Sequence, residues 1–345
     1  MLTAIGASLA LLLAGTTSED LDRQSFQECT ECGACVNIGE PACTHDGAAL
    51  VRVYMPRILA KRYRLEWRIG GGGMGAVYSG VDEALERPVA IKVIRPDQIG
   101  KGGIRARFHQ EARAAAGLLH RNVITIYDFG IEREHPFIVM ELLSGRTLRA
   151  ELDSSKRCSV ERTIEILDGA CAAIEEAHRR QFLHRDIKPE NIFLADTATG
   201  EVVKVLDFGL VKALGISKMS RTSTAPGGIA GTPCYMAPEQ LFGERVGPSS
   251  DVWALGVVAY EMLTGALPFA AETAAGWRKA LLDGAFTPLG LHQPNRFREA
   301  QSVFEAVFQP DPARRTASAR SFLSALALAL RSPLESGHSG NRGER

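Results

Sequence analysis

The stretch HRDIKPEN, residues 184–191, decides how the rest of this chain is interpreted. It places a carboxylate (Asp186), a cation (Lys188) and an amide (Asn191) within six consecutive residues, and an apolar run then leads to DFG at 207–209. Phosphoryl transfer needs a carboxylate that can accept a hydroxyl proton, a cation beside the phosphate, and oxygen or amide ligands for a metal ion. The stretch therefore favours phosphoryl-transfer chemistry.

A glycine-rich segment lies upstream, IGGGGMGAVY at residues 69–78, and fits the spacing G-x-G-x-x-G at Gly70, Gly72 and Gly75. Small residues let the backbone close over phosphates with no side chain in the way. The same spacing marks dinucleotide-binding folds, but those need a helix directly after the glycines. Here AVYSGV and then PVAIKVI follow, and both patterns predict strands.

Lys92 lies inside the apolar strand PVAIKVI, where an ammonium group needs a partner because an unpaired buried charge is costly. The next segment, residues 105–120, predicts a helix with Phe108, Ala112, Ala115 and Leu119 on one face. A later segment, residues 159–180, predicts a second amphipathic helix with apolar residues at steps of three and four.

Taken in chain order, the glycine-rich segment, Lys92, HRDIKPEN, DFG and the APE of residues 237–239 resemble the bacterial eukaryotic-type (Hanks-type) Ser/Thr protein kinases. The resemblance covers residues 63–330. It implies the bilobal α+β protein-kinase fold, with a β-rich small lobe and a helical large lobe. It also implies ATP-dependent transfer of the γ-phosphoryl group to Ser and Thr hydroxyls of protein substrates.

The resemblance assigns a role to each polar residue of the catalytic segment. Asp186 would take the proton of the substrate hydroxyl, and Lys188 would neutralise charge on the γ-phosphoryl group. Asn191 and Asp207 would hold Mg²⁺, for which Mn²⁺ can substitute, because hard oxygen ligands suit these ions.

The same resemblance predicts how ATP is held. Lys92 would contact the α- and β-phosphates and pair with Glu111 of the following helix. Backbone groups of Glu141 and Leu143 would bind adenine. The residues expected to sandwich the purine are Ile69, Val77, Ala90 and Leu194, with Met140 at the back of the pocket.

Five further residues are expected to have structural roles. His184 would support the DFG segment, and the carboxylate of Asp251 would cap the catalytic-loop backbone. Glu239 of APE would pair with Arg315 of the DPARR segment. Cys171 falls on the apolar face of the helix at 159–180, so it is expected to be a packing residue.

The segment between DFG and APE, residues 210–236, is rich in Ser, Thr and Gly. Arg185 stands directly before Asp186, where the family receives a phosphate carried by this segment. We therefore expect activation by autophosphorylation, with Thr222 and Thr224 as the preferred phosphosites. Thr232 is instead expected to bond to the catalytic aspartate and lysine.

A cysteine-rich segment, residues 29–50, precedes the kinase-like region and resembles the small zinc ribbons found ahead of some bacterial kinase domains. Cys29 and Cys32 form a C-x-x-C, and Cys43 follows. His45 is the predicted fourth zinc ligand, with Asp46 and Cys35 as competitors. Two alternatives stay open: reduced cysteines without metal, and an iron–sulfur site, although the spacing does not match ferredoxin patterns.

Composition limits the other functions. Among 345 residues, Lys plus Arg equals Asp plus Glu at 40 each, so no nucleic-acid partner is expected. Residues 1–28 comprise an apolar run and a polar linker; the run at 1–15 is short for a membrane span, so it predicts a weak anchor, a docked or disordered tail, or an early start codon. Residues 331–345 predict a disordered tail. A need for ATP favours the cytoplasm.

Two other functions compete with an active protein kinase. A pseudokinase or scaffold would bind partners through the cysteine-rich segment, but Lys92, Asp186 and Asp207 are all present. A small-molecule phosphotransferase is disfavoured by Lys188 and by the GTPCYMAPE segment, which resembles a peptide-docking feature. The substrate, the activating signal and the oligomeric state are not encoded in any recognisable motif.

Overall fold

The computed structural model describes residues 25–72, 75–96, 104–208, 233–269, 273–292, 297 and 299–331, with side chains from residue 108 in the helix that begins at 104. Thr222, Thr224 and Thr232 lie outside these residues, as do the run at 1–15 and the segment from 332 onward. The described residues fall into two units. The first comprises residues 25–116 and 125–143, and the second comprises 117–124, 144–208 and 233–331.

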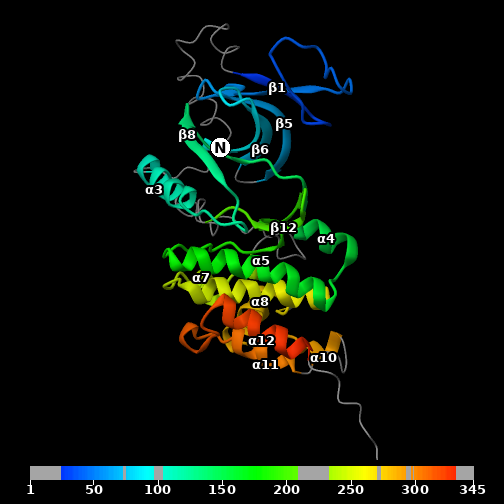
Figure 1. Ribbon diagram of the computed structural model, residues 1–345, viewed down its shortest axis with the longest axis vertical. Coiled ribbons are helices and arrows are strands. Elements are labelled where there is room, and N and C mark those ends of the chain that lie inside the picture. Colours follow the sequence, from blue (N-terminus) through cyan, green and yellow to red (C-terminus); the bar gives the residue numbers. More distant parts are fainter. Residues whose placement is uncertain are drawn as a thin grey trace, which may run out of the picture. The chain divides into compact units, whose positions relative to one another are not determined.

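The first unit is built on an antiparallel six-stranded sheet with strand order β4-β5-β6-β7-β9-β8 (Figure 1). A smaller sheet, β2-β1-β3, is formed by the cysteine-rich segment. The elements are β1 Phe26–Cys29, β2 Cys35–Val36, β3 Leu50–Val53, β4 Ile58–Leu59, β5 Tyr63–Gly72, β6 Gly75–Asp82, β7 Arg87–Ile94, α3 Ile104–Ala116, β8 Ile126–Glu132 and β9 His135–Glu141.

The two sheets of the first unit share one hydrophobic core. Phe26 and Cys35 from the cysteine-rich segment are buried with Tyr63, Tyr78 and Val139 of the large sheet. Phe26 and Tyr78 meet edge to face with ring centroids 6.1 Å apart. The cysteine-rich segment is therefore packed onto the large sheet and does not depend only on its own few apolar residues.

Helix α3 is shorter than the sequence pattern predicts. It ends at Ala116, directly before Gly117, and Leu119 is 69% exposed. Glycine lowers helix stability because it loses more backbone entropy than other residues when it is fixed. The predicted inward residues Phe108, Ala112 and Ala115 are buried, so only the last turn of the prediction is wrong.

The second unit is mainly helical. Its elements are β10 Gly145–Thr147, α4 Leu148–Ser155, α5 Val160–Arg179, the 3₁₀ helix η2 Pro189–Asn191, β11 Ile192–Thr197, β12 Gly200–Val205, η3 Pro233–Tyr235, α7 Pro238–Phe242, α8 Pro248–Thr264, α9 Ala274–Asp283, α10 Leu289–His292, α11 Ala300–Val307, η4 Pro312–Arg314 and α12 Ala319–Arg331.

Helices α5 and α8 form the centre of the second unit (Figure 1). Every residue of α8 from Ser250 to Leu263 is buried, as expected for a predominantly apolar helix at the centre of a unit. The α5 helix begins at Ser159, whose side chain accepts a hydrogen bond from the backbone N–H of Arg162. Cys171 is fully buried on α5, which confirms its predicted packing role.

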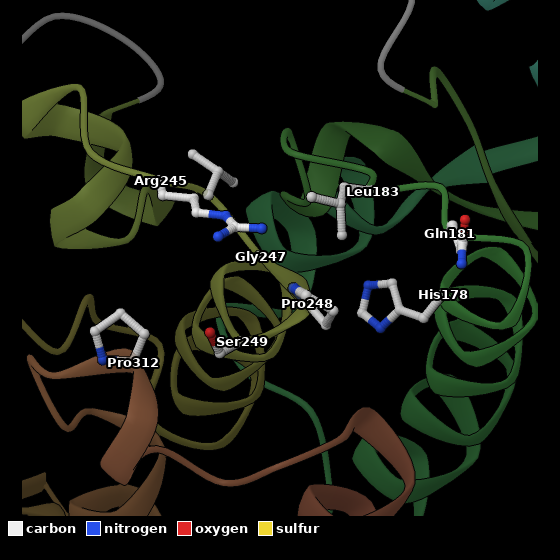
Figure 2. Close-up of a pocket in the computed structure, with 9 residues that line it drawn as sticks. His178, Gln181, Leu183, Arg245, Gly247, Pro248, Ser249 and Pro312 are labelled. Carbon is white, nitrogen blue, oxygen red and sulfur yellow. The ribbon is translucent and has the colours of Figure 1, made fainter.

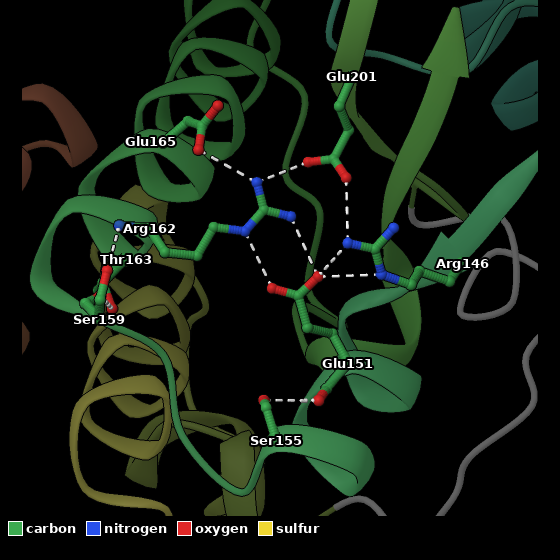
Figure 3. Close-up of polar contacts among 8 residues, drawn as sticks. All are labelled: Arg146, Glu151, Ser155, Ser159, Arg162, Thr163, Glu165 and Glu201. Carbon is green, nitrogen blue, oxygen red and sulfur yellow. Dashed lines mark hydrogen bonds and ion pairs between the residues drawn. The ribbon is translucent and has the colours of Figure 1, made fainter.

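A network of ion pairs holds the short sheet β10-β11-β12 against α4 and α5 (Figure 3). Arg162 of α5 pairs with Glu151 of α4 at 2.9 Å and with Glu201 of β12 at 2.7 Å. Arg146 of β10 contacts the same two carboxylates at 2.6 and 3.2 Å. Hydrogen bonding by Arg162 lowers the pKa of Glu151 despite partial burial. This network supports the β11–β12 hairpin, whose two ends lie next to Asn191 and Asp207.

Candidate active site and metal cluster

The hairpin β11–β12 brings the two ends of the predicted catalytic segment together. Ile192 pairs with Val205, directly after Asn191 and just before Leu206. The backbone N–H of Leu206 donates to the carbonyl of Asn191 at 2.9 Å. Asp207 follows at once, so the two predicted magnesium ligands are joined through one backbone hydrogen bond.

Asp186, Lys188 and Asn191 form a hydrogen-bonded group in the second unit. The Lys188 ammonium lies 3.1 Å from Asp186 Oδ2. Asn191 Nδ2 donates to the Asp186 carbonyl at 2.7 Å and to Oδ2 at 3.2 Å. Because the amide nitrogen is used in this way, its oxygen is the atom suited to a metal ion.

Two positions in this site hold non-glycine residues in the left-handed backbone region. Arg185 has φ of +65° and Asp207 has φ of +59°. Such conformations cost about 1–3 kcal/mol each and persist where the surrounding structure enforces them. At Arg185 the cause is visible, because Asp251 accepts the backbone N–H groups of His184 and Arg185 at 2.9 and 2.8 Å.

The predicted supporting residues occupy their expected places. Asp251 caps the catalytic-loop backbone and also contacts His178 Nε2 at 2.8 Å, and although burial opposes ionisation, these bonds hold its pKa below the usual range. The His184 ring contacts the Leu206 carbonyl at 2.8 Å and lies 4.6 Å from the Phe208 ring, so it supports the DFG segment.

The nucleotide-binding residues predicted in the first unit lie on its large sheet. Gly70, Gly71 and Gly72 of β5 pair with Val77, Ala76 and Gly75 of β6, which forms a glycine hairpin. A Cβ on Gly75 would come within 2.1 Å of the Val93 carbonyl, so this position requires glycine. Lys92 pairs with Val77 across the β6–β7 ladder, and Glu111 lies on α3. Their mutual contact stays a prediction.

The remaining predicted purine contacts are divided between the two units. Ile69 is 55% exposed beside the hairpin, whereas Ala90 and Met140 are buried in the sheet. Glu141 is anchored by Thr125, whose N–H donates to the Glu141 carboxylate at 2.7 Å, and Leu143 follows β9. Leu194 lies on β11 in the second unit and is fully buried in that unit's core.

A pocket in the second unit lies beside the catalytic-loop support (Figure 2). It is lined by His178, Gln181, Leu183, Pro312 and the segment 245–249. None of its lining residues has a predicted catalytic or nucleotide-binding role. It is therefore not the candidate active site.

A metal-ligand cluster lies in the cysteine-rich segment. Ligand atoms of Cys29, Cys32, Cys43 and Asp46 all lie within 4.8 Å of one another. Cys32 Sγ and Cys43 Sγ are 3.6 Å apart, and both Asp46 oxygens are 3.4 Å from Cys29 Sγ. Tetrahedral zinc with Zn–S bonds of about 2.3 Å needs ligand separations of about 3.8 Å. The group therefore fits zinc.

The observed cluster differs from the predicted zinc site in its fourth member. Asp46, not His45, joins the three cysteines, because its carboxylate accepts the Ala48 N–H at 2.9 Å and is turned toward them. The His45 ring packs edge to face against Trp67, with centroids 5.9 Å apart. Cys35 is buried in the sheet core and also lies outside the cluster. Spacing alone does not decide between the adjacent residues His45 and Asp46 as the fourth ligand, because the choice depends on the turn from Asp46 to Ala48.

Backbone hydrogen bonds to sulfur favour the thiolate form of Cys29. The N–H groups of Glu31 and Cys32 donate to Cys29 Sγ, and that of His45 donates to Cys43 Sγ, each at 3.4 Å. Burial works to raise the pKa of Cys29, but these backbone donors lower it overall. Donors aimed at sulfur favour the thiolate, which is the form that binds metal.

Comparison with known proteins identifies the family. The protein kinase domain profile matches residues 63–326. The chain belongs to the protein kinase family. A probable serine/threonine-protein kinase of Streptomyces coelicolor is 42% identical over 222 residues, 63% of this chain and 32% of that protein. The serine/threonine-protein kinase PknL of Mycobacterium tuberculosis is 41% identical over 217 residues, 63% of this chain and 53% of its own length.

Solved structures show the same fold. The PknI kinase domain of Mycobacterium tuberculosis superposes with a TM-score of 0.62 at 24% identity, over 79% of this chain and 98% of that domain. The β-rich first unit and helical second unit thus form a protein-kinase fold, as predicted. The chain spans about half or less of the two curated relatives. Among the described residues, no helix has both the length and the apolar character needed to cross a membrane.

Proposed function

We propose that this kinase domain transfers the γ-phosphoryl group of ATP to Ser and Thr hydroxyls of proteins, inside the cell, where ATP is available. The observation that carries the proposal is the group of Asp186, Lys188 and Asn191, joined through Leu206 to Asp207. Asp186 receives the hydroxyl proton, and Lys188 holds the carboxylate in place while it offsets phosphate charge. Relatives named serine/threonine-protein kinases support the acceptor class.

Asn191 and Asp207 would hold Mg²⁺, which supplies charge neutralisation on the phosphates when bound. Lys92 would bind the α- and β-phosphates, with Glu111 as its partner, beneath the glycine hairpin. Glu141 and Leu143 would bind adenine through their backbone. Each of these roles rests on the family match and on the positions of the residues in their own unit.

We further propose that phosphorylation at Thr222 and Thr224 activates the enzyme. Arg185 supports this proposal: within the described part of the chain its Nε is buried without a hydrogen-bond partner. A buried donor without a hydrogen-bond partner lowers the stability of the fold by about 1–3 kcal/mol. An anionic group such as a phosphate would satisfy the Arg185 Nε and remove this cost.

Incubation of the purified chain with γ-labelled ATP, Mg²⁺ and a generic protein substrate tests this function. We expect label on Ser and Thr of the substrate and on Thr222 and Thr224 of the chain itself, and slower transfer by the Thr222→Ala/Thr224→Ala variant. The Cys158→Ser variant, at a position with no proposed role in transfer or metal binding, provides a preparation control. Nucleotide binding without any transfer would instead indicate a pseudokinase that acts as a scaffold.

We also propose that Cys29, Cys32, Cys43 and Asp46 bind a structural Zn²⁺. Metal analysis of protein purified under reducing conditions is expected to find about one zinc per chain and no iron. Asp46→Asn should lower zinc affinity roughly tenfold or more, since changes even to groups that only orient ligands cost about 10–100-fold. His45→Gln, one residue away, is the matched control and should leave affinity unchanged. Zinc loss in His45→Gln alone would contradict the assignment.

A further inference from the structure

Glu28 links the metal cluster to the glycine hairpin. It precedes Cys29 in β1, and its side chain is only 8% exposed. Its Oε1 lies 2.9 Å from Arg68 Nε, and its Oε2 accepts a hydrogen bond from the Tyr78 hydroxyl at 3.1 Å. One buried carboxylate thus contacts a residue on each strand of the hairpin.

Arg68 and Tyr78 stand at the base of the glycine hairpin. They are direct cross-strand partners on β5 and β6, and the pairs that follow toward the tip begin with Gly70 and Val77. The register slips between Arg68 and Gly70, so Ile69 is the extra residue of a bulge. Arg68 Nη1 lies 3.4 Å from the place where a Cβ on Gly71 would stand. The guanidinium that binds Glu28 therefore lies against the phosphate-binding backbone itself.

The knuckle that carries Cys29 and Cys32 also touches β5 directly. The Arg68 N–H donates to the Gly33 carbonyl at 2.7 Å, and Ala34 bridges to Trp67. Gly33 has φ of +74°, and a Cβ there would lie 2.6 Å from the Arg68 carbonyl. The knuckle and the strand approach too closely to move independently.

The local core beneath the knuckle is small. It consists of Cys29, Ala34 and Cys43, with Ala48 and Leu50 partly buried against it. Two of its three buried residues, Cys29 and Cys43, belong to the metal cluster. Burial of apolar side chains in this local core therefore contributes little to the stability of the knuckle. Metal binding would therefore add stability at the knuckle beyond what the core shared with the large sheet provides.

We propose that metal at the Cys29–Cys32–Cys43–Asp46 cluster sets the affinity of the glycine hairpin for nucleotide, with Glu28 as the positioning residue between them. The inference rests on the zinc site proposed above. With metal bound, the knuckle holds Glu28 and the Gly33 carbonyl against Arg68, so the base of the hairpin is ordered before nucleotide binds. Without metal, part of the free energy of nucleotide binding is used to order the base of the hairpin, and the affinity for nucleotide is lower.

The test measures calorimetric affinity of the full chain for Mg²⁺ and a non-hydrolysable ATP analogue, with zinc bound and after its removal by a chelator. Zinc removal is expected to weaken nucleotide binding roughly five- to tenfold, a typical size for coupling between sites. By reciprocity, the analogue should tighten zinc binding by the same factor. Equal nucleotide affinity in both forms would overturn the proposal.

The Glu28→Gln variant tests the role of the Glu28 carboxylate separately from the presence of the metal. The zinc-loaded variant should keep its metal but bind the analogue severalfold more weakly and lose most of the zinc dependence, because a neutral amide holds the Arg68 guanidinium less strongly. Glu31→Gln makes the same change at an exposed position of the same knuckle and should behave like the unmodified chain.

The outcomes distinguish the linked proposals. A chain without zinc overturns the metal site and with it this coupling. Wild-type protein that binds no nucleotide contradicts the kinase function, and zinc-loaded Glu28→Gln with full affinity and full zinc dependence contradicts only the role of Glu28. Because the readout is binding, a slow phosphoryl-transfer step does not affect it.

Discussion

Asp186→Asn is expected to lower the rate of phosphoryl transfer by about 10²–10⁴-fold, the range associated with general acid–base groups. Asparagine has nearly the same shape but cannot accept the hydroxyl proton. The hydrogen bond from Asn191 to the backbone carbonyl of residue 186 is kept, since it does not involve the side chain. The loss should therefore fall on kcat, with little change in the KM for ATP.

Asp196→Asn is the matched control for this variant. Asp196 lies on β11, ten residues further along the same unit, and is exposed. The substitution should leave transfer unchanged. Steady-state assays with labelled ATP give both parameters, and melting curves show whether the fold is kept. Full activity of Asp186→Asn with an intact fold would remove Asp186 from the catalytic role.

Arg315→Met is expected to lower the free energy of unfolding by about 3–5 kcal/mol, the usual cost of leaving one member of a buried ion pair alone. Arg315 pairs with Glu239 at 2.8 Å, and their side chains are 0% and 1% exposed. Arg315 also donates to the carbonyls of Gln309 and Ser249, and its guanidinium lies 4.9 Å from the Trp253 ring. Urea unfolding followed by tryptophan fluorescence measures the loss.

Arg314→Met is the control, because this neighbouring arginine is exposed and should change stability little. The pH dependence gives a second check. Burial works to raise the pKa of Glu239, but hydrogen bonds from Arg315 and Ser250 hold it below its usual value. A lowered folded pKa means stability that is present above the ordinary glutamate pKa and lost as pH falls through the folded value.

In Arg315→Met, burial still raises the pKa of Glu239 while the contribution of Arg315 that lowers it is lost, so this pKa should rise. The buried charge then costs most at neutral pH and is removed by protonation in acid. The stability difference between the unmodified chain and Arg315→Met should therefore narrow as pH falls from the raised pKa of Glu239 in the variant to its lowered pKa in the unmodified chain. A difference that is constant across this range would show that lost packing against Trp253, and not the charge, is responsible.

Most of the proposed catalytic residues could be predicted from the sequence because they lie in one contiguous motif. Asp186, Lys188 and Asn191 are close in space because they are close in the chain, and a short turn leaves them little freedom. The pairs Glu239–Arg315 and Asp251 with the backbone of His184 were also predicted, although they span long stretches of chain. Those predictions came from the family resemblance, because no local pattern connects such distant residues.

Features that depend on a turn or on distant packing could not be read in this way. Helix α3 ends at Ala116 because fixing the backbone of Gly117 in a helix costs entropy. The apolar spacing alone predicted a helix that continued to Leu119. The fourth member of the metal cluster depended on the Asp46–Ala48 turn and on Trp67 packing against His45. Spacing limits which residues are available, but backbone geometry decides which of two neighbours faces a site.

The sequence by itself determined the family, the order of the catalytic parts and the apolar faces of the main helices, because each is written in short-range spacing. Only the tertiary structure decided that the cysteine-rich segment packs onto the large sheet through Phe26, and that Glu28 and Gly33 of this segment contact Arg68 at the base of the glycine hairpin. A buried carboxylate must find donors wherever the fold places them, and no local pattern specifies that place.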